Sequence, residues 1–348
     1  MKFCISMALP LLFLFVGCGS SEKTVYVLPI EFRIPAKKSD FIKSYSPYIQ
    51  GKKFFLDPGH GGNDRNNVGY KGTAVEADVN LNVALALRTF IIEAGGIVQL
   101  SRNKDTSVDL KDRSAMANKS GADFFISIHH NAPGQKEDIW TNYTSAYYHA
   151  TDSDYSFEPC QKDLAKYIQR DLAYAMRNSG GPGSFDGTYS DYSIYPSQGF
   201  SVLRLAKIPA ILVECGFTTS EFESHRITLN EFNMIEAWGI FRGICRYLAN
   251  GIPDIKFIKS LNDTSSQNIN LYFGIKDPAG IDLKSIKIYI DSVSYGYFTF
   301  NPMKNLLLIN YPVGNYGSHT IKIIASNNKG NYAFPFYYNI FVENKTGN

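Results

Sequence analysis

The 348-residue sequence has little net charge and no long basic run. Lysine and arginine exceed aspartate and glutamate by three, and charged residues make up 19% of the chain. Proteins that neutralise a nucleic-acid backbone carry clustered basic residues, and this sequence has no such cluster. The composition therefore gives no support to nucleic-acid binding, and partners must be inferred from motifs.

Cysteines are few and scattered. Of the five, Cys4 and Cys18 lie in the N-terminal apolar segment, which leaves Cys160, Cys215 and Cys245. Their spacing matches neither a disulfide framework nor a C-x-x-C metal motif. We expect these three to be free and buried thiols.

The apolar run near the N-terminus is too short for a membrane span. It extends from Phe3 to Val16, whereas a spanning helix needs ~20 apolar residues. A run of this length is typical of an export signal. The tetrapeptide that ends at Cys18 resembles the lipobox of bacterial lipoproteins, which predicts a signal peptide over residues 1–18 and a lipid on Cys18. Export to the cell envelope with a lipid anchor is therefore the prediction, with plain secretion, release into the periplasm or a retained anchor as alternatives.

The chain after the signal divides into three parts. Residues 19–50 contain serines, lysines and three prolines, which predicts a tether. From 51 to 252, strand-like runs alternate with helical periods, which is typical of an α/β domain with a mixed, largely parallel sheet and helices on both faces. The expected strands are Lys53–Leu56, Ile97–Leu100, Phe124–Ile128, Ser145–Tyr148, Ser201–Leu203 and Ile211–Val213. The expected helices begin near Glu76, Asp109, Pro159 and Leu229.

Residues 253–348 have a different pattern. Short runs in which every second residue is apolar, such as Ile286, Ile288 and Ile290, are separated by turn residues such as Asp277-Pro278-Ala279-Gly280. This pattern predicts an all-β sandwich, and the segment resembles the immunoglobulin-like modules of bacterial surface enzymes.

Three side chains lie at strand ends or helix starts of the α/β part. His60 follows the first strand in a glycine-rich loop, Glu76 opens the next helix, and His129 ends the strand Phe124–Ile128. Each alone has a plain structural explanation, such as a solvated loop histidine or a carboxylate at a helix N-terminus. Ligands bind at the carboxyl edge of such sheets, however, and two histidines with one carboxylate are a common catalytic zinc set.

A fourth candidate is Glu214, which follows the apolar run Ile211–Val213. A carboxylate at the end of a buried strand is costly unless a charge compensates it, and a nearby metal ion would do so. Glu214 is therefore a candidate for moving protons during metal-assisted hydrolysis.

Several motifs together resemble the family-3 type of zinc-dependent N-acetylmuramoyl-L-alanine amidases. They include Asp57-Pro58-Gly59-His60-Gly61-Gly62, Glu76, Arg102, Arg113, Ser127-Ile128-His129-His130-Asn131-Ala132, Val202-Leu203-Arg204 and Val213-Glu214-Cys215-Gly216-Phe217. The resemblance implies one zinc ion held by His60, Glu76 and His129, with Glu214 as the catalytic carboxylate. It also implies cleavage of the amide between the lactyl group of N-acetylmuramic acid and L-alanine. Peptidoglycan is then the substrate, and a protein activator is a further candidate partner.

The motif departs from the family pattern at two positions. His130 stands where a small residue is common, and Cys215 follows Glu214 where other residues are usual. Strand side chains alternate between faces, so we expect His130 and Cys215 to point away from the metal. Asp57 and Asn131 are candidates for orienting a ligand, and turn capping is an equal explanation for Asp57.

Three alternatives remain open at this stage. Arg204 is a candidate for binding a stem-peptide carboxylate, with a surface ion pair as the competing interpretation. A related zinc peptidase is the enzymatic rival, although its ligands usually share one short motif while Glu76 follows His60 by 16 residues. A non-catalytic wall-binding lipoprotein is the third, although the complete set of candidate residues argues against it.

Overall fold

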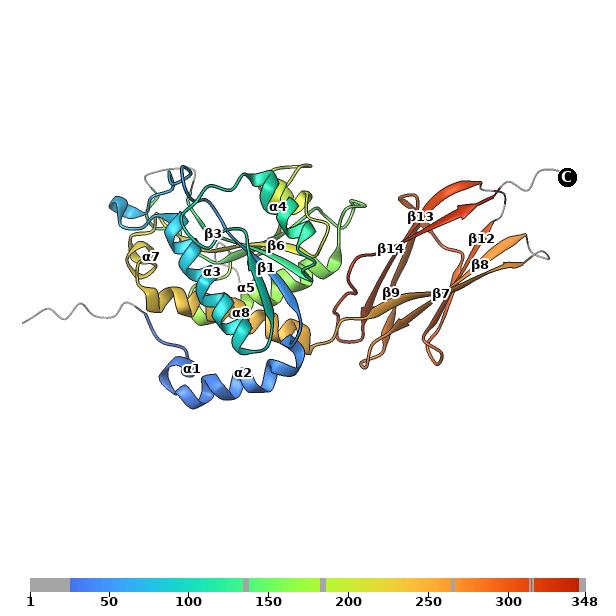
Figure 1. Ribbon diagram of the computed structural model, residues 1–348, viewed down its shortest axis with the longest axis horizontal. Coiled ribbons are helices and arrows are strands. Elements are labelled where there is room, and N and C mark those ends of the chain that lie inside the picture. Colours follow the sequence, from blue (N-terminus) through green and yellow to red (C-terminus); the bar gives the residue numbers. More distant parts are fainter. Residues whose placement is uncertain are drawn as a thin grey trace, which may run out of the picture.

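The computed structural model describes residues 26–133, 138–181, 186–263, 267–312, 314 and 316–343. The predicted signal peptide and Cys18 lie outside these residues. Figure 1 shows an α/β part followed by a β part, joined where the last long helix ends. Within the described ranges, no helix has the length and apolar character needed to cross a membrane.

The first part is built on a six-stranded sheet in the order β2-β1-β3-β6-β4-β5. All neighbouring strands are parallel except β4 and β6, which are antiparallel. The strands are β1 (Lys53–Pro58), β2 (Ile97–Leu100), β3 (Phe124–Asn131), β4 (Ser145–Tyr148), β5 (Thr188–Ser190) and β6 (Ala210–Phe217). The mixed, largely parallel sheet agrees with the sequence pattern.

Helices cover both faces of this sheet. The longer ones are α3 (Glu76–Glu93), α4 (Leu110–Lys119), α5 (Pro159–Met176) and α8 (Asn230–Ala249). Short turns of helix are η1 (Tyr70–Gly72), η2 (Asp191–Ser193), α6 (Ser201–Arg204) and α7 (Glu221–Arg226). Phe54 and Leu56 belong to the core shared with α3, α5 and α8, whereas Phe55 belongs to the core shared with α4 and α6. This alternation is the period of two that a strand imposes.

One predicted strand is a helix. Ser201–Leu203 was expected to be extended, but it forms α6, in which Phe200 accepts backbone hydrogen bonds from Leu203 and Arg204. An apolar run of three residues does not distinguish the two states, because burial alone satisfies both. Val202 and Leu203 are buried together with Ala117 of α4.

The prediction of a tether is also wrong from Ile30 onward, where the segment is helical. This segment forms α1 (Ile30–Arg33) and α2 (Pro35–Ile49), which Figure 1 shows in blue against the α/β part. Ile42 and Ile49 are buried in the main core, and the Phe41 ring contacts Trp238 of α8. Pro35 occupies the first helical position, where its missing N–H costs nothing.

The second part consists of two four-stranded antiparallel sheets, ordered β10-β9-β13-β14 and β11-β12-β8-β7. Its strands are β7 (Asp254–Asp263), β8 (Asn268–Lys276), β9 (Ile281–Ile290), β10 (Val293–Tyr295), β11 (Phe298–Asn301), β12 (Leu306–Pro312), β13 (Gly317–Asn327) and β14 (Phe336–Val342). Side chains from both sheets share one core, with Phe273 of β8 and Ile288 of β9 among them. The predicted all-β character is confirmed at this level.

Direct contacts join the two parts. The Lys322 ammonium group is buried and donates to the carbonyl oxygens of Tyr155 and Phe157 at 2.7 and 3.0 Å. It also pairs with Glu158 at 2.9 Å. The Asn331 amide donates to the Tyr247 carbonyl at the end of α8 at 3.0 Å. The β part is therefore anchored by buried polar groups.

Replacement of Ile49 by alanine tests whether the N-terminal helices belong to the folded unit. Ile49 is fully buried, so I49A should lower the free energy of unfolding by about 2–5 kcal/mol. Ile34, which is 43% exposed, provides the control, and I34A should change it by less than ~0.5 kcal/mol. Urea unfolding measures both, and equal values for the two variants would contradict this packing.

Candidate metal centre

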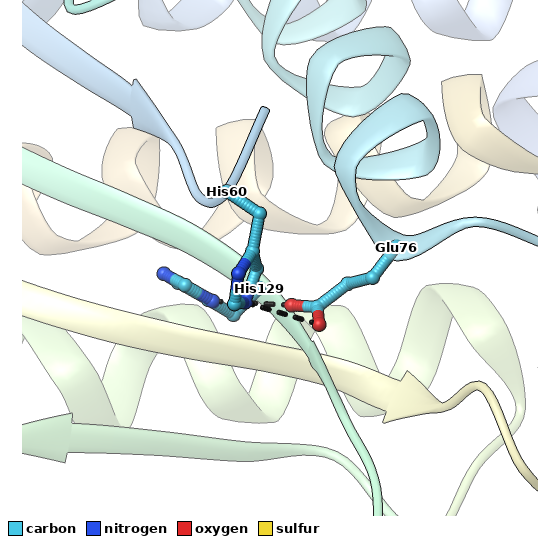
Figure 2. A group of neighbouring side chains, drawn as sticks. All are labelled: His60, Glu76 and His129. Carbon is cyan, nitrogen blue, oxygen red and sulfur yellow. Dashed lines mark hydrogen bonds and ion pairs between the residues drawn. The ribbon is translucent and has the colours of Figure 1, made fainter. Parts of the chain in front are cut away.

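Three side chains converge at the carboxyl edge of β1 and β3. His60 lies in the loop after β1, His129 lies near the end of β3, and Glu76 is the first residue of α3. One ligand atom from each lies within 4.8 Å of the others, a grouping that can hold a metal ion. Figure 2 shows the Glu76 carboxylate directed toward both imidazoles. The structure thus brings together the three residues that the sequence singled out.

Each oxygen of Glu76 faces a different histidine. Oε2 lies 3.1 Å from Nε2 of His60, and Oε1 lies 3.1 Å from Nδ1 of His129. Burial by itself raises the pKa of Glu76, but the hydrogen bonds with His129 and His60 hold it well below its usual range. The carboxylate is therefore negatively charged and shared between the two imidazoles.

The pKa of His60 is shifted in the opposite direction, upward. Burial favours its neutral form, yet hydrogen bonds and negative charge from Glu76 and Asp64 raise the pKa of His60 to about 9. Asp64 lies 2.8 Å from Nδ1 on the other side of the ring. A metal ion would have to displace the proton that this imidazole holds against Glu76, so metal binding releases protons here.

Glu214 lies on β6 next to His129, because the two residues are Cα partners in the β3–β6 pairing. Its Oε2 atom is buried and has no hydrogen-bond partner within the described part of the chain. Burial and the negative charge of Glu76 raise the pKa of Glu214 well above its usual range. An unpartnered carboxylate oxygen beside another carboxylate is costly, and a cation between them would offset the cost. The residues therefore fit a metal ion.

Two buried arginines fix the loop that carries His60. Arg102 donates from Nε to the Pro58 carbonyl at 2.9 Å and from Nη2 to the Gly59 carbonyl at 2.8 Å. Arg113 donates from Nη1 to the Pro58 carbonyl and from Nη2 to the His60 carbonyl, both at 2.9 Å. Because backbone carbonyls are held at three successive residues, the loop has little freedom to move the imidazole.

Asp57 acts on this loop indirectly. It is fully buried, pairs with Arg113 at 2.6 Å and accepts hydrogen bonds from the hydroxyls of Ser101 and Ser127. It thus orients an arginine that holds the His60 carbonyl, and none of these bonds reaches an imidazole. The position of Asp57 in the first motif indicated a role at the site, but the sequence spacing could not show that Arg113 is its partner.

The other two secondary candidates are engaged elsewhere. The Asn131 side chain accepts a hydrogen bond from the Ala132 N–H. The backbone carbonyl of Asn131 accepts another from the Thr218 N–H at 2.9 Å. Arg204 is exposed and donates to the carbonyls of Gln198 and Gly199. These contacts place both residues in backbone capping.

Sequence reasoning missed two amides that hold Glu76. Asn67 donates from Nδ2 to Oε2 of Glu76 at 2.6 Å, and Asn80 donates from Nδ2 to Oε1 at 3.1 Å. Asn80 lies one helical turn after Glu76, a spacing that could have identified it. Asn67 precedes the helix in an irregular loop, where no periodicity marks it.

The expectation for His130 and Cys215 is confirmed. β3 and β6 both continue past the site, although the register of their pairing shifts between His129 and Asn131. His130 bonds to Asn80 and Glu236 on the helix-covered side, and Cys215 belongs to the core of the same side. Cys160, Cys215 and Cys245 are all free and buried, as the spacing predicted.

A cleft of about 480 Å³ opens against His60 and His129. Arg113, Ser107 and Val202 are among its lining residues. The cleft gives a substrate access to the atoms that would hold the metal. Together, the sheet edge, the cleft and the His–Glu–His group define the chain as an α/β protein with an accessible site for a metal ion.

Comparison with known proteins identifies the family. Residues 54–246 match the model of the N-acetylmuramoyl-L-alanine amidases. A germination-specific amidase of this type from Bacillus subtilis is 31% identical over 236 residues, which cover 64% of this chain and 90% of that protein. A sporulation-specific one from the same organism is 28% identical over 63% of this chain and 74% of its own length. A crystal structure of an amidase from Clostridium difficile 630 covers 57% of this chain and 98% of its own, with 32% identity and a TM-score of 0.49.

The chain belongs to the N-acetylmuramoyl-L-alanine amidase family. It is a peptidoglycan hydrolase that cleaves the amide bond between N-acetylmuramic acid and the L-alanine of the stem peptide. The peptidase and the non-catalytic protein considered from the sequence are set aside by this membership.

Gly59 offers a test of the site geometry. A Cβ atom on Gly59 would lie 2.1 Å from Cε1 of His129, closer than any real contact. The variant G59A should therefore displace the His129 ring and lower metal affinity at least about tenfold. Equilibrium dialysis followed by metal analysis measures this. G296A is the matched control, because nothing lies within 4 Å of a Cβ there, and wild-type affinity in G59A would contradict the geometry.

Proposed function

We propose that the metal is a single zinc ion held by His60, Glu76 and His129. Two imidazoles and one carboxylate are a common ligand set of catalytic zinc, which keeps a further position for water or substrate. The observation that supports this most directly is the shared Glu76 carboxylate, which presents one oxygen to each imidazole. Imidazole nitrogen also suits zinc better than it suits magnesium or calcium.

Glu214 would move the protons of the reaction. A bound zinc ion would supply a Lewis acid for the scissile carbonyl and would activate the attacking water. The Glu214 carboxylate would take a proton from that water and return it to the alanine nitrogen as the C–N bond breaks. Water and amide are thereby converted into the lactyl carboxylic acid and a stem peptide with a free amino terminus.

The position of Glu214 supports this role. It lies next to His129 across the β3–β6 pairing, and its Oε2 atom has no hydrogen-bond partner among the residues that the structure describes. A base that is already committed to a strong hydrogen bond would be a poorer proton acceptor. Asp57, by contrast, accepts bonds from Arg113, Ser101 and Ser127 and is unsuited to the task.

Digestion of purified peptidoglycan tests this mechanism. E214Q should retain zinc and lose about 100- to 10,000-fold in kcat, because the amide cannot accept the proton. Treatment of the wild type with a chelator should abolish cleavage, and added zinc should restore it. Mass spectrometry of the released stems reads out the reaction, since amidase products carry an intact L-alanine amino terminus.

E221Q is the matched control for E214Q. Glu221 is an exposed carboxylate on α7 whose loss should leave kcat unchanged. Cleavage that survives the chelator, or an E214Q enzyme with wild-type kcat, would refute the mechanism. Stems shortened from within would indicate peptidase activity instead.

We also propose that the mature enzyme is a lipoprotein. The short apolar run and the residues before Cys18 support cleavage just before Cys18 and lipidation of that cysteine as the new N-terminus. Anchoring would keep the enzyme outside the cytoplasm, where its polymer substrate lies. A single modified N-terminus would leave the folded part from Ile30 onward free to approach the wall.

Substitution of Cys18 tests the lipid anchor. C18S should move the protein from the membrane fraction to the soluble or secreted fraction and abolish incorporation of labelled fatty acid. The buried thiol Cys245 offers a control, because C245S keeps the lipobox and should stay in the membrane fraction. A wild-type protein that incorporates no label would count against lipidation.

We further propose a division into a zinc amidase domain over residues 51–252 and an immunoglobulin-like accessory domain over 253–348. Two antiparallel sheets with a common core support the second domain. The helices α1 and α2 pack on the first domain and would act as its N-terminal extension. The anchors at Lys322 and Asn331 would hold the accessory domain in a fixed orientation.

A further inference from the structure

His130 occupies the core directly behind the candidate zinc site. It follows His129 on β3 but points to the opposite face, between α3 and α8, and its side chain is fully buried. Its Nδ1 atom lies 2.8 Å from Oδ1 of Asn80, and its Nε2 atom lies 2.9 Å from Oε1 of Glu236. Both ring nitrogens are therefore engaged.

Hydrogen-bond partners determine which atoms carry protons. Nδ2 of Asn80 donates to Oε1 of Glu76 at 3.1 Å and to the Gly59 carbonyl at 3.3 Å, so its Oδ1 atom must be the acceptor toward His130. Nδ1 of His130 is then an N–H donor, and Nε2 lies within hydrogen-bond distance of the Glu236 carboxyl group. The imidazole is therefore held between Asn80 and Glu236.

The same residues form a second group that could hold a metal ion. Donor atoms of His130, Cys215 and Glu236 lie within 4.8 Å of one another. In the structure, both ring nitrogens of His130 are directed at oxygen atoms, Oδ1 of Asn80 and Oε1 of Glu236. The contacts of the cluster are therefore those of a buried histidine–carboxyl pair beside a thiol.

The His130–Glu236 pair reaches the Glu76 carboxylate by two routes. The backbone N–H of His130 donates to Oε1 of Glu76 at 3.0 Å. The His130 ring holds the Asn80 amide, which donates to the same oxygen. On the far side, Nδ2 of Asn233 donates to Oε2 of Glu236 at 3.1 Å. A continuous chain of buried hydrogen bonds thus connects α8 to the proposed zinc ligand.

We infer that His130 and Glu236 are positioning residues that hold Asn80, and through it Glu76, in the orientation that presents one carboxylate oxygen to each zinc-binding histidine. This inference rests on the proposed zinc site. Groups that orient a metal ligand without touching the metal typically change metal affinity about 10- to 100-fold when they are removed.

The double variant H130A/E236L tests the inference. It removes both partners together, so neither is left buried and uncompensated. We expect zinc affinity, measured by competition with a chromogenic chelator, to fall about 10- to 100-fold. We also expect kcat to fall more than KM for peptidoglycan changes, and the cavity left by the imidazole to lower the Tm of the metal-free protein, as in the H149A control below.

Two further variants separate positioning from bulk stability. E236Q should retain most of the zinc affinity, because a glutamine amide can donate to Nε2 while Nδ1–H still bonds to Asn80. The control H149A removes a buried histidine that pairs with Asp191 at 2.9 Å beyond the end of β4. It should lower Tm and leave zinc affinity unchanged.

Three results would contradict the positioning role, the interpretation of the His130 cluster or the zinc site itself. Wild-type zinc affinity in H130A/E236L would overturn the positioning role. A wild-type protein that binds two zinc ions, one of which is lost in C215S, would show instead that the cluster is a metal centre. A wild-type protein that binds no zinc would refute the proposed zinc site, and the inference with it, before any variant is compared.

Discussion

The Glu76 carboxylate is the interaction on which the site depends. It is buried, it carries negative charge, and it must be compensated by whatever surrounds it. His60 arrives from the loop after β1, His129 from β3, and the amides of Asn67 and Asn80 complete the set. Because one side chain unites α3, β3 and the loop between β1 and α3, the elements at this edge are fixed relative to one another.

Electrostatics explains why this arrangement calls for a cation. Glu76 and Glu214 lie close enough for the negative charge of Glu76 to raise the pKa of Glu214. The histidines compensate Glu76, but Oε2 of Glu214 has no hydrogen-bond partner among the described ranges. The protein therefore stores an unfavourable interaction at the one place where the proposed zinc ion would relieve it.

Much of the fold and the main site could be predicted from the sequence because both depend on local patterns. The periods of two and 3.6 marked most of the strands and helices around the sheet, and strand ends marked His60 and His129. Sequence reasoning failed where distant residues decide the outcome. The N-terminal segment contains prolines and lysines typical of a tether, yet Glu31 pairs with Arg242, 211 residues away, and Ile49 is fully buried.

The same limit applies to the polar partners of the site. Asn80 lies one helical turn from Glu76 and could have been identified by spacing. The pairing of His130 with Glu236 joins residues 106 positions apart, and no periodicity in either segment indicates it. The prediction of a strand at Ser201–Leu203 was wrong for another reason. A short apolar run is equally compatible with a buried helical turn and a buried strand.

Strand alternation places the chemistry and its support on adjacent residues. On β3, His129 faces the proposed zinc and His130 faces α8. On β6, Glu214 and Cys215 repeat this division. Adjacent residues share a peptide bond, so a shift of the backbone at His130 also moves His129. α2 packs on α8, and α8 carries Glu236, which contacts His130, so this packing bears on the position of His129, the proposed zinc ligand.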